Sequence, residues 1–277
     1  MILVTGATGN IGSALLKELR TRGVGPLGGL TRDAARADLP EGVEAVEGDL
    51  SEPASLKSVL EGVRSLFLVP RLGSDADILD AAQQAGVEHV VLVSSITVQT
   101  HPHLDPAREN LAVEELLKAS DMAWTILRPT QFASNTLMWA SSIRGQETVR
   151  APYADVALPT IHPADIASVA RVALTEPGHH GRTYALTGPE PVTPRQQVGA
   201  IAAAVGRQIP FVEISRQQAR AQMAAAFGAE AADAVLDVTG GDTNDELLMV
   251  RDTVSRITGT PARPFRQWAI ENVDAFH

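Results

Sequence analysis

The chain has 277 residues, of which 44% are apolar and 20% are charged, and its formal net charge is −10. This length can bury a substantial core, the composition is ordinary for a globular protein, and no apolar run approaches the roughly 18 residues of a membrane span. The acidic balance without a basic run argues against nucleic acid and membrane surfaces as partners, and the lack of cysteine excludes disulfides and thiolate chemistry.

The first twelve residues, MILVTGATGNIG, predict a strand at 2–5, a glycine turn and the start of a helix. Gly6 permits a tight turn, Gly9 lets the backbone approach a phosphate, and Gly12 lets the helix pack closely against the strand. Unpaired N–H groups at such a helix start bind the pyrophosphate of a dinucleotide. Because the strand adjoins Met1, we expect no targeting peptide and a cytoplasmic protein.

Strands and helices alternate through the following residues. Further strands are predicted at 27–31, 43–47, 65–69, 89–94 and 124–127. Helices are predicted at 13–22, 54–60, 75–85 and 107–119. Short, continuous apolar strands are typical of a sheet that helices cover on both faces. The pattern therefore predicts an α/β protein with a Rossmann-like, doubly wound parallel sheet in the order 3-2-1-4-5-6.

Residues typical of helix ends support several of these boundaries. Ser74 and Thr193 fit helix N-caps, and Gly86 fits the position after a helix end. Asp105, followed by Pro106, is predicted to be the N-cap of the helix after the fifth strand.

After residue 130 the alternation fades into mainly helical sequence. A helix at 163–174 and a strand at 183–186 are expected to return to the sheet, and further helices are predicted at 196–205 and 217–234. The segment 238–245 is interpreted as a flexible loop, either a lid or a plain turn between helices.

These elements predict two parts that fold as one unit. The first is an NAD(P)-binding domain, and the second is a small, mainly helical substrate-binding lobe over the carboxyl ends of the strands, where ligands bind in such sheets. The domain comprises 1–130 plus about 160–187, and the lobe comprises 131–159 and 188–277.

The residues at the strand ends indicate which dinucleotide is bound. Arg32 follows the second strand, where NAD-binding folds carry an acidic residue for the ribose hydroxyls. An arginine there offers a planar cation to a 2′-phosphate, which favours NADP over NAD, unless Arg32 is a solvated surface residue. Asp49, before Leu50, could accept from the adenine amino group or cap a short turn. Val69 and Pro70 end the fourth strand, where the backbone is expected beside the adenine ribose and pyrophosphate.

Longer motifs point to one family. They are TGATGNIG at 5–12, GDL at 48–50, SS at 94–95, WTILRPTQF at 124–132, IHPADIASVARVAL at 161–174, YALTGPE at 184–190 and ITGTPARPFRQWAIEN at 257–272. Almost end to end, the chain resembles the NmrA-like, atypical branch of the short-chain dehydrogenase/reductase superfamily. Within that branch it is most similar to triphenylmethane reductase and the NADPH:quinone reductases of that type.

The resemblance implies roles for individual residues. The pyrophosphate loop would comprise Gly6, Thr8, Gly9, Asn10, Ile11 and Gly12, and Arg32 would bind the 2′-phosphate. Ser94, Ser95 and Pro129 would lie near the nicotinamide. Phe132, Asn135 and Trp139 would line the substrate side, although packing in the core is an alternative for the two aromatic residues.

The chain departs from the superfamily at its catalytic pair. Typical members carry Tyr-x-x-x-Lys on the helix after the fifth strand, and a glutamate four residues later, which matches Glu114. The tyrosine position is then Pro106, which cannot transfer a proton, and the lysine position is Asn110, which can hydrogen-bond a ribose hydroxyl but supplies no charge. The catalytic residue is therefore unassigned. His101, in the loop before this helix, is left open as a general acid, and no metal site is predicted.

This departure favours hydride transfer that needs little acid catalysis. We expect an NAD(P)H-dependent reductase of a small conjugated or cationic acceptor, quinone-like or iminium-like, in which the protein binds, orients and excludes water. The alternative is a non-catalytic NADP(H)-binding sensor, and only that interpretation requires a protein partner.

Overall fold

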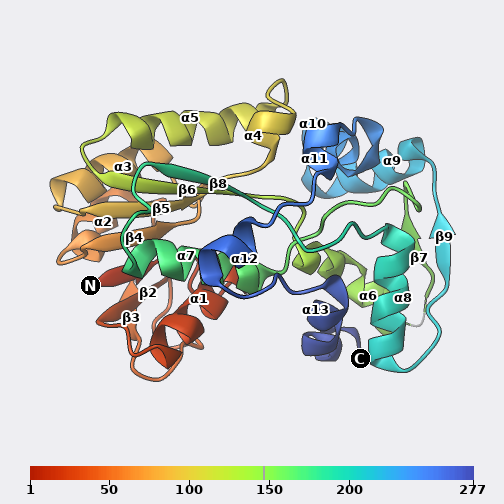
Figure 1. Ribbon diagram of the computed structural model, residues 1–277, viewed down its shortest axis with the longest axis horizontal. Coiled ribbons are helices and arrows are strands. Elements are labelled where there is room, and N and C mark those ends of the chain that lie inside the picture. The colour runs from red at the N-terminus through yellow and green to blue at the C-terminus, as the bar shows by residue number, and fades with distance from the viewer. Residues whose placement is uncertain (146) are drawn as a thin grey trace.

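A parallel β-sheet forms one half of the molecule in the computed structural model, which describes residues 1–145 and 147–277 (Figure 1). Over these residues the sheet has seven strands in the order β3-β2-β1-β4-β5-β6-β8. They are β1 (Ile2–Val4), β2 (Leu27–Thr31), β3 (Glu44–Glu47), β4 (Ser65–Leu68), β5 (His89–Val93), β6 (Ala123–Pro129) and β8 (Arg182–Leu186). The predicted fold class and strand order are confirmed, and β8 extends the sheet beside β6.

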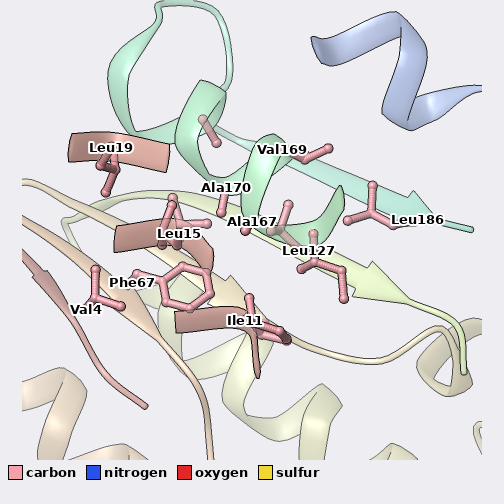
Figure 2. Close-up of a cluster of buried hydrophobic side chains, with 14 of the residues drawn as sticks. Val4, Ile11, Leu15, Leu19, Phe67, Leu127, Ala167, Val169, Ala170 and Leu186 are labelled. Carbon is pink, nitrogen blue, oxygen red and sulfur yellow. The ribbon is translucent and has the colours of Figure 1, made fainter. Parts of the chain in front are cut away.

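Helices cover both faces of this sheet, as the apolar strands require. One face carries α1 (Asn10–Thr21), α7 (Pro163–Thr175) and α12 (Thr253–Thr258), and the other carries α2 (Pro53–Leu60), α3 (Asp75–Gln84) and α5 (Asp105–Ala119) (Figure 1). Figure 2 shows the first of these cores, in which Leu15 and Leu19 of α1 and Phe67 of β4 lie near Ala167 and Ala170 of α7. The small alanine side chains let α7 approach α1 closely. Packing against α7 thereby holds α1 on the sheet, with the start of α1 at the carboxyl edge of the strands.

The other half of the molecule is a lobe of short elements. A two-stranded parallel sheet pairs β7 (Val149–Ala151) with β9 (Phe211–Glu213). Around it lie η1 (Ala133–Trp139), α6 (Ala140–Arg144), α8 (Pro194–Val205), α9 (Arg216–Phe227), α10 (Ala229–Leu236), α13 (Phe265–Glu271) and η3 (Val273–Phe276). The lobe has its own apolar core, in which Trp268 packs against Phe265 and Phe276.

Three short elements lie where the two halves meet. They are α4 (Thr97–Thr100), η2 (Asp237–Gly241) and α11 (Asp245–Leu248). Side chains join them across more than a hundred residues of sequence: Gln99 donates to Glu246 at 2.7 Å, and Asn244 donates to the Thr100 carbonyl at 2.9 Å. Of the alternatives for 238–245, the structure therefore contains a turn between helices: η2 is followed by the non-helical residues 242–244, and α11 begins at Asp245.

Most predicted boundaries agree with the structure, and two do not. Ser74 and Thr193 accept N-cap hydrogen bonds, and Gly86 has a φ of +80° after α3. The prediction for Asp105 was wrong, because Leu104 is the N-cap and the Asp105 carboxylate pairs with Arg108 instead of a backbone N–H. The single helix predicted at 217–234 is two helices, since Gly228 separates α9 from α10 with a φ of +93°.

No helix of the described residues is long and apolar enough to cross a membrane.

Candidate functional site

The glycine turn has the geometry of a phosphate-binding loop. Gly6 has a φ of +60°, and its carbonyl oxygen accepts from the Gly9 N–H at 2.9 Å. A Cβ on Gly12 would lie 2.2 Å from that carbonyl oxygen, so the turn closes only around a glycine. Thr8, Gly9 and Asn10 are exposed, and α1 begins at Asn10. The first N–H groups of a helix have no partner within it, so this exposed start fits the pyrophosphate of a dinucleotide.

The end of β4 supports this loop from behind. The Val69 N–H donates to the Thr5 hydroxyl at 2.8 Å, and a Cβ on Gly6 would lie 3.5 Å from a Val69 methyl group. Pro70 follows and is half-buried. The structure therefore brings the end of β4 to the glycine turn, and a contact of Val69 and Pro70 with the adenine ribose and pyrophosphate stays a prediction.

Arg32 and Asp49 lie at the ends of the neighbouring strands. Arg32 is exposed, and no carboxylate of the described chain lies within ion-pair distance of it. Asp33 caps the following turn by accepting from Ala35 and Arg36, at 3.1 and 3.2 Å. Hydrogen bonds from the hydroxyl and amide of Ser51 hold the pKa of Asp49 below its usual range.

Of the two alternatives for Asp49, the structure therefore contains the turn cap, made with one carboxylate oxygen. A contact between its other oxygen and an adenine stays a prediction. The adjoining Leu50 is buried.

A buried glutamate occupies the region where β5 meets α5. Glu114 accepts from Ser94 at 2.6 Å, from Arg128 at 2.8 and 2.5 Å, and from Lys118 at 3.1 Å. Burial alone would raise the pKa of Glu114, but the hydrogen bonds from Arg128 and Ser94 and the charge of Arg128 lower it below its usual value. The Ser94 hydroxyl therefore donates to Glu114 of α5, and a contact of Ser94 with the nicotinamide stays a prediction.

The remaining residues predicted near the nicotinamide are partly engaged within the protein. The Ser95 hydroxyl accepts from the amide and hydroxyl of Thr97, at 3.2 and 2.8 Å. Asn110 is buried and donates to the Pro106 carbonyl at 2.7 Å, which leaves its amide oxygen as the available acceptor. The Pro129 carbonyl accepts from Ile96 at 3.0 Å, which ties the ends of β5 and β6 together.

Directly beyond β6 the chain enters the lobe along a fixed path. Phe132 forms a parallel bridge with Ile161, whose N–H donates to the Gln131 carbonyl and whose own carbonyl accepts from Ala133, each at 2.8 Å. Asn135 donates to the Gln131 side chain at 2.9 Å. These bonds hold the Gln131 and Phe132 side chains at the carboxyl edge of the sheet.

A cavity of about 570 Å³ opens at this point. Phe132, Asn135 and Trp139, the three residues predicted for the substrate side, all line it. The sequence did not predict the rest of its wall, which comes from distant segments: Arg150, Ala151, Pro152, Val192, Pro194, Gln197, Ile214, Gln222, Met223, Phe227 and Val235 among others. No local motif marks these residues, since β7, β9 and α9 come together only in the folded lobe.

The described lining of this cavity contains hydroxyls and amides but no Tyr, His, Lys, Asp or Glu side chain. Tyr153 lies outside it, with its ring against Gly240 and its hydroxyl accepting from Arg216 at 3.3 Å. His101 is fully buried, and its Nε2 lies 2.5 Å from the Asp242 carbonyl oxygen. Within residues 1–145 and 147–277, no three His, Cys, Asp or Glu side chains form a cluster that could hold a metal ion.

The sheet order, the glycine turn at its carboxyl edge and the adjoining cavity define a Rossmann-like, dinucleotide-binding protein. Residues 6–177 match the protein family described as NAD(P)H-binding. The chain belongs to this family.

Two relatives match over the whole chain. It is 38% identical to the (4-alkanoyl-5-oxo-2,5-dihydrofuran-3-yl)methyl phosphate reductase of Streptomyces griseus, over 100% of this chain and 99% of the relative. It is 36% identical to the NAD(P)H azoreductase of Xenophilus azovorans, with the same coverage.

A solved structure of an NADPH-dependent quinone oxidoreductase from Escherichia coli, in complex with NADPH, is similar with a TM-score of 0.81. The two chains are 25% identical, over 98% of this chain and 99% of that one. The resemblance to the atypical short-chain dehydrogenase/reductase branch is confirmed.

Proposed function

We propose that the protein is an NADPH-dependent reductase that delivers hydride to a small conjugated acceptor held in the cavity beyond β6. The observation that carries this proposal is the position of the cavity, which begins with Gln131 and Phe132 at the carboxyl edge of the sheet, where a Rossmann-like fold holds its dinucleotide. The relatives are a reductase of an (alkanoyl-oxo-dihydrofuranyl)methyl phosphate, an azoreductase and a quinone oxidoreductase. The unsaturated furanone ring, the azo group and the quinone in these names are all conjugated acceptors.

The cofactor would lie across the strand ends. The exposed start of α1 and the turn of Gly6, Thr8, Gly9, Asn10, Ile11 and Gly12 would bind the pyrophosphate, and Arg32 would bind the 2′-phosphate that distinguishes NADP from NAD. The adenosine would be bordered by Asp49, Leu50, Val69 and Pro70. The nicotinamide would be bordered by Ser95, Asn110 and Pro129. Ser94 would lie beside them and support the site through its hydrogen bond to Glu114.

When bound, NADPH supplies a hydride. The chain's own contribution is to hold the acceptor flat against the carboxyl edge with Phe132 and Trp139 and to exclude water with the apolar wall. Reduction of a quinone to a hydroquinone takes one hydride and one proton. Because the described wall offers no Tyr, His, Lys, Asp or Glu side chain, water would supply the proton.

The same proposal divides the chain into a cofactor domain and a substrate lobe. The cofactor domain would comprise 1–130 plus about 160–187, which is supported by the pairing of β8 with β6. The substrate lobe would comprise 131–159 and 188–277, which provide nearly all of the cavity wall. We place the protein in the cytoplasm, with a small molecule as its partner.

The test is loss of the NADPH absorbance band when the purified protein is mixed with a panel of quinones and azo compounds. Turnover with any of them, faster with NADPH than with NADH, is the expected result. Tight NADPH binding without oxidation by any acceptor would replace the proposal with that of a cofactor sensor.

A further inference from the structure

The cavity has an unusual charge for this chain. The protein carries a formal net charge of −10, yet the described wall of the cavity contains no aspartate or glutamate. Its one charged residue among the described lining is Arg150. The described wall is therefore largely apolar and carries one positive and no negative side chain, in a protein that is acidic as a whole.

Arg150 is also available to a ligand. It lies in β7 opposite Val212 of β9, and the next pair in the register is Ala151 with Glu213. Glu213 is not among the described lining residues, and its carboxylate accepts from the Ala154 N–H at 3.0 Å. Arg150 is exposed, and no carboxylate of the described residues lies within ion-pair distance of it.

Three other arginines of the lobe differ in this respect. The guanidinium groups of Arg195, Arg216 and Arg220 are paired with Asp155, Asp237 and Asp233. Arg150, which alone of these four lines the described cavity, has no such partner, so its charge is not neutralised by the protein.

The position of Arg150 sets the orientation of a ligand. The cavity begins with Gln131 and Phe132 at the end of β6, whereas Arg150 comes from β7, which Figure 1 shows in the lobe, away from the parallel sheet. The same wall also includes the apolar side chains of Trp139, Ile214 and Met223. A ligand that spans this space meets the sheet edge at one end, apolar surface along its body and a cation at the other end.

We propose that the physiological acceptor carries an anionic group, such as a carboxylate, sulfonate or phosphate, that Arg150 binds while the conjugated carbon at the opposite end receives hydride. This inference rests on the proposed function. A guanidinium forms strong charge-assisted bonds with such oxyanions, and an unpaired cation disfavours a cationic guest. Of the acceptor classes that the sequence left open, iminium compounds and cationic dyes are therefore the ones that this cavity selects against.

The test compares two acceptors that differ in one charge, 1,4-naphthoquinone and 1,4-naphthoquinone-2-sulfonate. In Arg150→Gln, kcat/KM for the sulfonate should fall about tenfold, mainly through KM, while kcat/KM for the neutral quinone changes less than about threefold. Arg266→Gln, which removes the same charge from an exposed position on α13 outside the described cavity wall, should leave both values unchanged. Equal losses with the two quinones in Arg150→Gln would overturn the inference.

A binding measurement separates this inference from the proposed function. Calorimetric titration of 1,4-naphthoquinone-2-sulfonate into the protein with NADP⁺ involves no turnover, and its Kd should also rise about tenfold in Arg150→Gln. If NADPH is never oxidised but this difference in Kd appears, the proposed reductase activity fails and the anion site stands. If the Kd is the same in Arg150→Gln and the parent protein, the anion site fails whatever the activity.

Discussion

The hydroxyl of Ser94, at the end of β5, donates to the buried carboxylate of Glu114 in α5 at 2.6 Å. Arg128 of β6 binds the same carboxylate, so one anion fastens two neighbouring strands to the helix that covers them. In the superfamily this helix carries the catalytic pair, and here it carries Pro106 and Asn110. Glu114 therefore keeps the position of the helix although the tyrosine and lysine are absent.

Replacement of Glu114 by glutamine should destabilise the protein by roughly 3 kcal/mol at pH 7, since Arg128 would lose its buried partner. The lowered pKa of Glu114 gives the sign of the pH dependence: its contribution is complete above the ordinary value of 4.5 and is lost as the pH falls through the folded-state pKa. The difference between parent and Glu114→Gln in urea unfolding should therefore shrink below about pH 4.5. Glu115→Gln, at the exposed neighbouring position, is the control and should change little.

Arg32→Asp should weaken NADPH binding by about 10- to 100-fold, because a charge-assisted contact with the 2′-phosphate becomes a repulsion. NADH, which lacks that phosphate, should bind within about threefold of the parent value. Lys57→Asp makes the same change of charge at an exposed position on α2 and should alter neither affinity. Fluorescence titration of both cofactors measures the effect, and equal losses for NADPH and NADH would remove Arg32 from the site.

Gly12→Ala should reduce cofactor affinity more than tenfold and cost about 1–3 kcal/mol of stability, because the new Cβ would lie 2.2 Å from the Gly6 carbonyl oxygen and the turn would have to move. Gly199→Ala is the matched control in α8, where a Cβ meets nothing within 4 Å. In a helix interior that change should stabilise the protein by about 0.5–1 kcal/mol. Thermal unfolding and cofactor titration of both variants check the pair, and similar behaviour would contradict the role given to Gly12.

His89 should make stability fall between neutral pH and pH 4. Burial lowers the pKa of His89 to about 4, with smaller contributions from the charges of His180 and His179. The folded protein thus binds fewer protons than the unfolded chain, so its stability decreases as the pH drops from about 6.5 toward 4. In His89→Asn the urea concentration at the unfolding midpoint should change less with pH over that range. In His277→Asn, at the exposed C-terminal residue, it should change with pH as in the parent.

The cofactor half of the molecule could be predicted from sequence because its signals are local. The spacing of Gly6, Gly9 and Gly12 between a strand and a helix predicts the turn, and short apolar strands alternating with helices predict the parallel order. The lobe could not be predicted in this way. Three-residue strands such as β7 and β9 have no measurable periodicity, and the contact of Arg150 with the cavity depends on pairing across about 60 residues of chain.

Individual side chains show the same limit. The Ser94 hydroxyl is at the predicted strand end, but its direction is decided by Glu114 in another element. Asp105 has the residue type of an N-cap, yet Arg108 one turn later competes for its carboxylate. Residue type and spacing predict where a group lies along the chain, whereas its partner is decided by packing between elements.

Part of the cavity wall lies outside the residues that match the NAD(P)H-binding family. The match ends at residue 177, while α9 and α10, which supply Met223, Phe227 and Val235 to the cavity, lie beyond it and pack outside the core of the parallel sheet. Phe227 and Val235 are also 48% and 37% exposed, and changes at such positions usually alter stability by less than about 0.5 kcal/mol. The cavity can therefore be reshaped by substitutions in these two helices with little cost in stability and without a change in the glycine turn at the start of α1.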